Sequence, residues 1–201
     1  MIYDITTNSF KYYDNESGPE QFISSNFVSH VLVLSSGIKW VGTYGAGLLK
    51  YSPFEPGFRS VSQDANRSRG LQNNLVFSIL EDRNSSVWIG THGGGLNKLT
   101  KDINTNEIHS QVYRAGEIPS DVVICSAADM DGNIWIGTRE GIVYFNQQSK
   151  EFQSPIGITG QVDNLSDKFI WEIFCDSEGQ IWVGTWDGLF FLIKRNKALF
   201  K

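Results

Sequence analysis

Several residue types are scarce in this 201-residue chain, and each shortage excludes a class of protein. Its two cysteines, Cys125 and Cys175, are too few for a disulfide framework or a zinc site and are expected to be buried free thiols. No apolar run approaches the roughly 18–20 residues of a membrane helix. No stretch of about 12 residues shows helical periodicity. The first residues, MIYDITTNSFKYY, lack the basic-then-apolar pattern of a signal peptide.

Positive charge is also in short supply. The formal net charge is −5, which disfavours a sequence-independent nucleic-acid binder, so no nucleic acid is expected among the partners. Glycine and aromatic residues, by contrast, are abundant, with 20 Gly, 13 Phe and 6 Trp. Hydrophobic residues make up 40% and charged residues 19%, which is a globular composition. Many glycines together with many aromatics indicate short strands joined by tight turns.

A repeat of about 47 residues runs through the sequence and predicts its architecture. Four segments share the pattern Trp, Val or Ile, Gly, Thr, and their tryptophans are spaced by 48, 47 and 47 residues. An Asp six residues before the Trp recurs in three copies, whereas the first copy has Leu34. A Gly three residues before the Trp also recurs in three copies, with Ser85 as the exception. The repeat positions are Trp40, Trp88, Trp135 and Trp182; Gly42, Gly90, Gly137 and Gly184; and Asp82, Asp129 and Asp176.

Each copy of the repeat is predicted to form four short strands. The first is β-branched and apolar, as in residues 76–80, and a turn leads from it to the second strand, which holds the Trp. A glycine-containing loop precedes the third strand, and a weaker fourth follows at 58–61, 108–113 and 151–153. Four strands in a unit of this length are typical of β-propeller blades. The sequence therefore predicts an all-β fold of antiparallel four-stranded blades, with about four and a half repeats.

The whole chain, residues 1–201, is predicted to be one propeller region whose ends fall within blades. The first residues resemble the third and fourth strands of a preceding blade, and residues 198–201 could only begin a last fourth strand. The predicted divisions are 1–22, 23–70, 71–117, 118–164 and an incomplete blade at 165–201. An open arc leaves blade faces and edges exposed, which favours a fragment of a larger propeller, of about seven or eight blades, over a closed four-bladed ring.

The recurring residues of the repeat have a structural interpretation. A single blade cannot bury both of its faces, so each Trp is expected to pack against the neighbouring blade. Burying one indole there contributes at most roughly 4–6 kcal/mol. The Gly that follows leaves room for the neighbour, and the Thr suits a strand end. A row of tryptophans that stack on sugars is the alternative interpretation.

The pattern Trp-[Ile/Val]-Gly-Thr-x-x-Gly-[Leu/Ile], preceded by Asp-x-x-Gly, resembles the two-component regulator propeller repeat. The resemblance is closest at residues 75–99 and 165–192, and the loops at 45–47 and 93–95 depart from it by one extra residue. It implies a periplasmic sensor domain of a bacterial hybrid two-component system, whose histidine kinase lies in a longer parent. The implied partners are the other blades and signalling domains of that parent, with a homodimer as a further candidate.

One set of loop residues is a candidate ligand site. In propellers, the loops that join second to third strands share a face with those that join fourth to first strands, and ligands usually bind there. The residue after Gly-Thr varies among aromatic, cationic and hydrogen-bonding types, a mixture that suits a sugar. The candidates are Tyr44, His92, Arg139 and Trp186, followed by Glu140 and Asp187 in the last two copies, with Asn26, Asn74, Asp121 and Lys168 at the other loop tips. The alternative is that they are exposed loop residues without a ligand.

Other motifs have ordinary structural explanations. Residues 90–98, GTHGGGLNK, lack the Gly-Lys-Ser/Thr ending of a phosphate loop and lie between two strands. Residues 129–133 imitate the start of a calcium loop but have no Glu at the required distance. His30, His92 and His109 lie in different blades or strands, without the spacing of a metal or catalytic pair. Neither a metal site nor a cofactor is expected.

The expected function is non-enzymatic sensing of an oligosaccharide or other small ligand, which the family resemblance implies. Ligand binding would favour one arrangement of the parent protein and pass that bias to a kinase outside this chain. Two alternatives remain. A protein-interaction propeller would respond to no small molecule. A propeller lyase or glycoside hydrolase would need converging carboxylates, for which Glu140 and Asp187 are the nearest candidates.

Overall fold

The computed structural model describes residues 2–16, 23–55, 57–63, 70–101, 107–155, 165 and 167–192. All regular structure in these residues is β-strand, which confirms the predicted all-β class. None of them forms a helix that could span a membrane.

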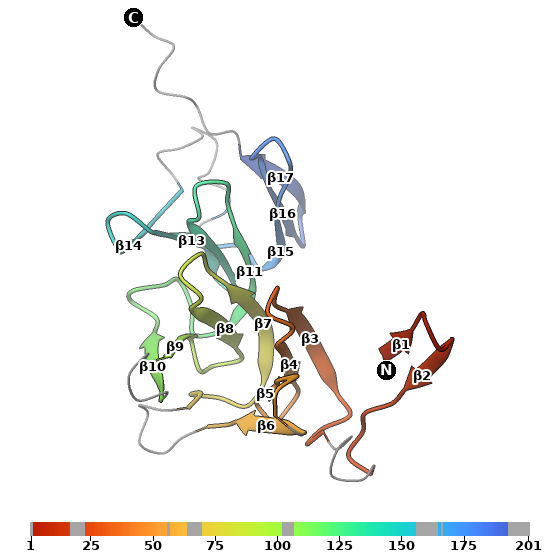
Figure 1. Ribbon diagram of the computed structural model, residues 1–201. Coiled ribbons are helices and arrows are strands. Elements are labelled where there is room, and N and C mark those ends of the chain that lie inside the picture. The colour runs from red at the N-terminus through yellow and green to blue at the C-terminus, as the bar shows by residue number, and fades with distance from the viewer. Residues whose placement is uncertain are drawn as a thin grey trace, which may run out of the picture.

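Four antiparallel sheets follow one another along the chain, and they are named here the first to fourth blade (Figure 1). The first blade holds β3 (Val28–Val33), β4 (Lys39–Thr43), β5 (Leu48–Tyr51) and β6 (Phe58–Val61). The second holds β7 (Val76–Glu81), β8 (Val87–Thr91), β9 (Leu96–Lys101) and β10 (Ile108–Tyr113). The third holds β11 (Val123–Ala128), β12 (Ile134–Thr138), β13 (Gly141–Asn146) and β14 (Glu151–Gln153). The fourth holds β15 (Ile170–Cys175), β16 (Ile181–Thr185) and β17 (Gly188–Leu192).

A separate hairpin precedes the four blades. Strand β1 (Ile2–Asp4) pairs antiparallel with β2 (Ser9–Lys11), as the third and fourth strands of a blade would. Its assignment to a preceding blade stays a prediction, as do the predicted divisions of the chain. Residues 198–201, where a last fourth strand could begin, lie outside the described residues.

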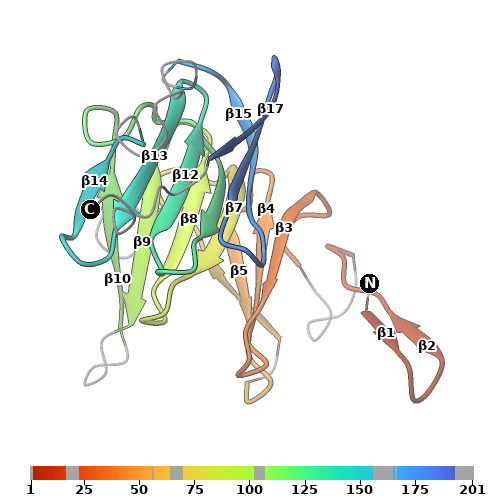
Figure 2. The same ribbon diagram turned by 90° about the horizontal axis from the view of Figure 1, so that it is seen from above.

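The four blades follow one another around an arc, and the first strand of each blade contacts the first strand of the next. Strands β3, β7, β11 and β15 are neighbours in this order, while β6, β10 and β14 form the opposite edges of their sheets (Figures 1 and 2). The buried apolar side chains of the described residues form three clusters, and each of them joins two successive blades. This is the radial arrangement of a β-propeller, in which each sheet packs face to face against the next.

The repeat tryptophans lie in these interfaces, as the sequence predicts. Trp40 packs with residues of the second blade, Trp88 with the third and Trp135 with the fourth. Trp88 and Trp135 are at most 1% exposed, whereas Trp182, in the last described blade, is half-buried. The glycine two residues later is required by the same interface, because a Cβ at Gly137 would lie 2.6 Å from the Ile170 side chain of the next blade.

The recurring Asp ties the turn of each blade to its Trp. In the second, third and fourth blades, one carboxylate oxygen accepts two backbone N–H bonds from the turn, and the other accepts the indole N–H. The indole bonds measure 2.9 Å from Trp88, 3.1 Å from Trp135 and 2.7 Å from Trp182. Ser85, which replaces the turn glycine, adopts the same left-handed backbone with φ 60°. The Asp therefore fixes the turn and the core at once.

Candidate ligand-binding face

The predicted ligand residues lie in the turns between the second and third strands of each blade, which together form one edge of the arc. We call this edge the ligand-binding face, after the role that the sequence analysis predicts for it. Each turn is closed by the preceding Thr, whose hydroxyl donates to a carbonyl across the turn. The backbone N–H of Tyr44, His92 and Arg139 donates to a carbonyl just before the first strand of the same blade, at 2.9, 3.0 and 3.0 Å. Their side chains are thus carried on a fixed main chain.

The two loops with an extra glycine residue also bond to the next blade. Gly45 and Gly47 donate their N–H groups to the carbonyl of Asn74, at 3.1 and 3.0 Å. Gly93 and Gly95 donate in the same way to Asp121, at 3.0 and 2.9 Å. The departures from the family pattern therefore connect the turns of one blade to the loop tip of its neighbour.

A first aromatic group spans the first and second blades. The ring of Tyr44 lies 5.4 Å from that of Phe77, which in turn lies 5.5 Å from the imidazole of His92 in an edge-to-face arrangement. Tyr44 is 51% exposed and His92 is also exposed, so the group presents open ring faces to solvent. Two of the six predicted residues are thereby brought together.

A second aromatic group lies on the fourth blade. The Trp186 ring stands 5.1 Å from that of Trp171 and 6.1 Å from that of Phe169, and the last two are 4.6 Å apart. Trp186 is 71% exposed and Trp171 46%. Asp187 forms an ion pair with Lys168 beside this group. The fourth blade therefore carries a compact, exposed aromatic surface with charges next to it.

The remaining candidates differ in whether their side chains are exposed to solvent or bonded within the protein. Arg139 and Glu140, on the third blade between the two aromatic groups, have exposed side chains. The loop tips are engaged in bonds within the protein: the Asn74 side chain accepts the N–H of Gln63 at 2.7 Å, and Asp121 pairs with Arg114 at 3.2 Å. Asn26 likewise exchanges hydrogen bonds with the Asn15 segment. These tip residues support the loops that carry the site.

Three aromatic members of the face, Phe77, Phe169 and Trp171, are absent from the sequence-based prediction. Phe77 and Trp171 occupy one repeat position, directly after the first residue of the first strand, where the strand pairing shifts by one residue. Such a bulge turns a side chain away from the alternation expected of a strand. The sequence signal that could have identified these two residues is that the same repeat position holds an aromatic side chain in the second and fourth copies.

The remaining titratable groups contribute little to this face. Burial lowers the pKa of His30, although Glu172 opposes that effect. Burial also raises the pKa of the Cys125 thiol, with Glu172 adding to the shift, so the thiol stays protonated. Cys125 is buried, as expected, and Cys175 is half-buried. Within the described ranges, the His, Cys, Asp and Glu side chains form no group that could hold a metal ion.

Chemically, the face offers ring surfaces that can pack on the apolar side of a flat ligand. The charged groups between and beside these rings can bond to ligand hydroxyls.

Comparisons with known proteins agree with this architecture. Residues 70–93, 117–140 and 164–187 match the family model of the two-component regulator propeller. Each matched segment runs through a first strand, its Asp turn and the Trp strand, and the first blade, which has Leu34, is outside the matches. No curated protein sequence matches the chain.

Solved structures resemble the chain closely in fold. The extracellular domain of BT4673 from B. thetaiotaomicron, described as a hybrid two-component system, superposes with a TM-score of 0.70 at 25% identity. The match covers 98% of this chain and 25% of that one, so the present chain spans about a quarter of its length. PorZ, a surface component of the type-IX secretion system of Porphyromonas gingivalis, matches at 18% identity with a TM-score of 0.65, over 90% of this chain and 28% of PorZ.

A propeller enzyme shares the fold as well. Virginiamycin B lyase from Staphylococcus aureus matches with a TM-score of 0.56 at 11% identity, over 86% of this chain and 57% of the enzyme. Identity this low shows the fold alone. The family match and the BT4673 likeness confirm the resemblance to the two-component regulator propeller repeat in the three segments that the family model matches.

Proposed function

We propose that this chain is part of the ligand-sensing propeller of a hybrid two-component system, located outside the cytoplasm, and that its ligand-binding face takes up an oligosaccharide. The observation that carries the proposal is the pair of exposed aromatic groups, Tyr44 with His92 and Trp186 with Trp171, on one edge of the arc. The extracellular domain of BT4673, which matches 98% of this chain in fold at 25% identity, supports the sensing role and the location.

A sugar matches this face because one side of a pyranose is apolar and its rim carries hydroxyls. Trp186 would lie against the apolar side, and Arg139 and Glu140 would bond to the rim. An oligosaccharide could extend from the second aromatic group past the third blade toward the first. Binding would favour one arrangement of the parent protein, and a kinase elsewhere in the parent would respond to that bias.

The proposed role is non-catalytic. Glu140 is exposed, and the carboxylate of Asp187 is held in an ion pair with Lys168. A glycosidase needs two carboxyl groups at a defined separation around the bond to be cleaved. The lyase likeness concerns the fold only, since the identity is 11%.

Calorimetric titration of the 201-residue chain against a panel of plant and host oligosaccharides tests the proposal. One sugar class should bind, and Trp186→Ala should weaken it by about tenfold or more, since a lost aromatic contact of about 1.5 kcal/mol corresponds to that factor. Phe54→Ala is the matched control, because Phe54 is 84% exposed but lies in the loop between β5 and β6, at the opposite edge. Equal loss in both variants would refute the assignment of the face.

The enzyme alternative is distinguished by product analysis. Incubation of the bound sugar with the wild-type chain should leave it intact. Cleavage that disappears in a Glu140→Gln, Asp187→Asn double variant would replace the sensor role by a catalytic one.

A further inference from the structure

Trp40 differs from the other repeat tryptophans in one respect. Its position six residues upstream holds Leu34 in place of Asp, although the turn has the same backbone bonds, Leu34 N–H to Ile38 at 2.9 Å and Gly37 N–H to Leu34 at 2.9 Å. The side chain is only 6% exposed, and its Nε1–H finds no hydrogen-bond partner in the part of the chain that the structure describes. A buried donor without a partner is unfavourable, and an added acceptor would remove that penalty.

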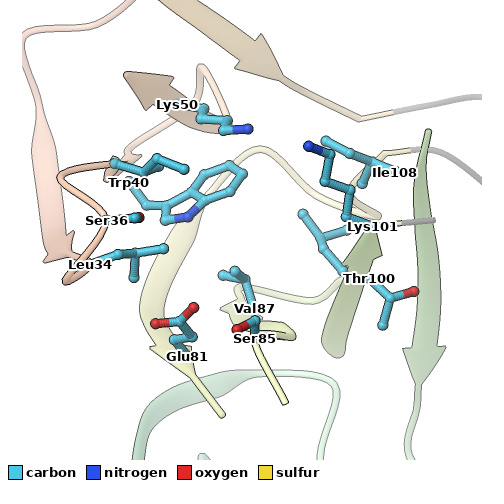
Figure 3. A pocket seen from close by; sticks show the side chains of 12 residues that line it. Leu34, Ser36, Trp40, Lys50, Glu81, Ser85, Val87, Thr100, Lys101 and Ile108 are labelled. Carbon is cyan, nitrogen blue, oxygen red and sulfur yellow. The ribbon is translucent and has the colours of Figure 1, made fainter. Parts of the chain in front are cut away.

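A pocket opens beside this unpaired donor, between the first and second blades. Its volume is about 260 Å³. Leu34, Trp40, Val87 and Leu99 contribute apolar walls, and Figure 3 shows the indole reaching into the space that the other side chains surround. The pocket lies among the turns between first and second strands, at the edge opposite to the ligand-binding face, and its role is independent of the function proposed for that face.

The pocket exists because two large side chains of the next interface have small counterparts here. Above Trp88, Phe145 lies 5.1 Å from the indole and is itself 5.1 Å from Phe152, its cross-strand partner. The corresponding cross-strand pair of the second blade is Leu99 with Ser110. The hydroxyl of Ser110 is also buried without a partner among the residues described. Leu99, which lines the pocket, is smaller than Phe145 and therefore leaves open part of the space that phenyl rings fill in the next interface.

The two ends of the pocket carry opposite charge. The Lys50 ammonium stands 5.6 Å from the centre of the Trp40 ring, and Lys101 lines the pocket near it (Figure 3). Burial lowers the pKa of Lys50, and the repulsion from Lys101 lowers it further. Glu81 lies on the other side, toward which the nitrogen edge of the indole faces in Figure 3. An anion between the two lysines would relieve their repulsion.

We propose that this pocket binds a small aromatic carboxylate that carries a hydroxyl group at the far end of its ring. The carboxylate would lie between Lys50 and Lys101. The ring would pack against Trp40 and Val87, and the hydroxyl would accept the N–H of Trp40 while donating its own hydrogen to Glu81. The indole N–H of Trp40, the two ammonium groups and the Glu81 carboxylate then each have a partner on the ligand, and both polar ends of the ligand have partners in the pocket. A volume below roughly 300 Å³ restricts the ligand to a single ring with a short side chain.

Calorimetry of the 201-residue chain with three matched compounds tests this assignment. 4-Hydroxyphenylacetate has both polar ends, phenylacetate lacks the hydroxyl, and 2-(4-hydroxyphenyl)ethanol lacks the charge. The first should bind with a Kd of about 0.1–1 mM, and each of the others at least about fivefold more weakly, because each loses one set of polar bonds. No binding of 4-hydroxyphenylacetate up to about 10 mM would overturn the proposal.

Variants of the chain locate the binding. Leu34→Asp supplies the carboxylate that the other blades have, so it should occupy the indole N–H and abolish binding. Lys50→Met should weaken binding by about tenfold because the ion pair with the carboxylate is lost. This variant tests the site independently if Leu34→Asp folds poorly. Lys98→Met is the matched control, since Lys98 holds the same place above Trp88, 4.8 Å from its ring, where Phe145 fills the space. Binding that is unchanged in Lys50→Met, or lost equally in Lys98→Met, would refute the site.

Discussion

The Asp of the third blade should be worth more to stability than an ordinary surface carboxylate. Asp129 is 5% exposed and accepts four hydrogen bonds: 2.9 Å from the N–H of Asp131, 2.9 and 3.0 Å from the main chain and side chain of Asn133, and 3.1 Å from Trp135. Asp129→Asn keeps one oxygen for the two turn amides but points an NH₂ group at two donors. It should cost about 2–3 kcal/mol, whereas Asp129→Leu, which loses all four bonds, should cost about 4–5 kcal/mol.

Urea unfolding followed by far-UV circular dichroism measures both costs, and a double-mutant cycle isolates the indole bond. Trp135→Phe removes the donor, so Asp129→Asn should be cheaper in that background by about 1.5–2 kcal/mol. Asp129→Asn within about 0.5 kcal/mol of the wild type, or a coupling energy near zero, would show that the carboxylate does not hold the Trp and the turn together.

Three further perturbations follow from the described geometry. The hydrogen bond from Trp182 holds the pKa of Asp176 in the folded protein below its ordinary value. Asp176 therefore stabilises the fold fully above the pKa of the unfolded chain, and this stabilisation is lost as the pH falls through the lower pKa of the folded state. Asp176→Asn should flatten the decline of the urea midpoint between about pH 5 and pH 2, and an unchanged slope would contradict this. Iodoacetamide should modify half-buried Cys175 first and spare buried Cys125 until denaturant is added, as peptide mass mapping would show; early labelling of Cys125 would mean an open interface. Gly95→Ala should lower the midpoint strongly, because φ is +70° and the new Cβ would clash with a backbone carbonyl of β10, whereas Gly45→Ala, with nothing within 4 Å, should carry only the backbone strain.

Much of the fold follows from the period of the sequence. The fourth strands predicted at 58–61, 108–113 and 151–153 coincide with β6, β10 and β14, because short apolar segments between turn residues leave little freedom for a strand to shift. The burial of Trp88 and Trp135 against the next blade follows from the same repeat. A repeat position records a structural requirement that every blade shares.

The candidate site could be predicted only in part, because it is made of what the blades do not share. The turn residues, such as Tyr44 and Trp186, are found from the repeat as its variable position. Phe77 and Trp171, which complete the two aromatic groups, lie at a bulge where strand alternation gives the wrong face. The pocket beside Trp40 has no single sequence signal, since it needs a missing carboxylate at Leu34 in one blade and small side chains in another.

In the turns of the ligand-binding face, the main chain holds neighbouring blades together, while the side chains are left to contact a ligand. Gly45 and Gly47 hold the neighbouring blade through the carbonyl of Asn74, and these bonds make no demand on the side chain at position 44. Substitutions at Tyr44 or His92 can therefore change what the face recognises with little effect on how the blades cohere. A scaffold of this kind can acquire new ligand preferences by single substitutions, and it offers the same freedom to a designer who wishes to redirect the sensor.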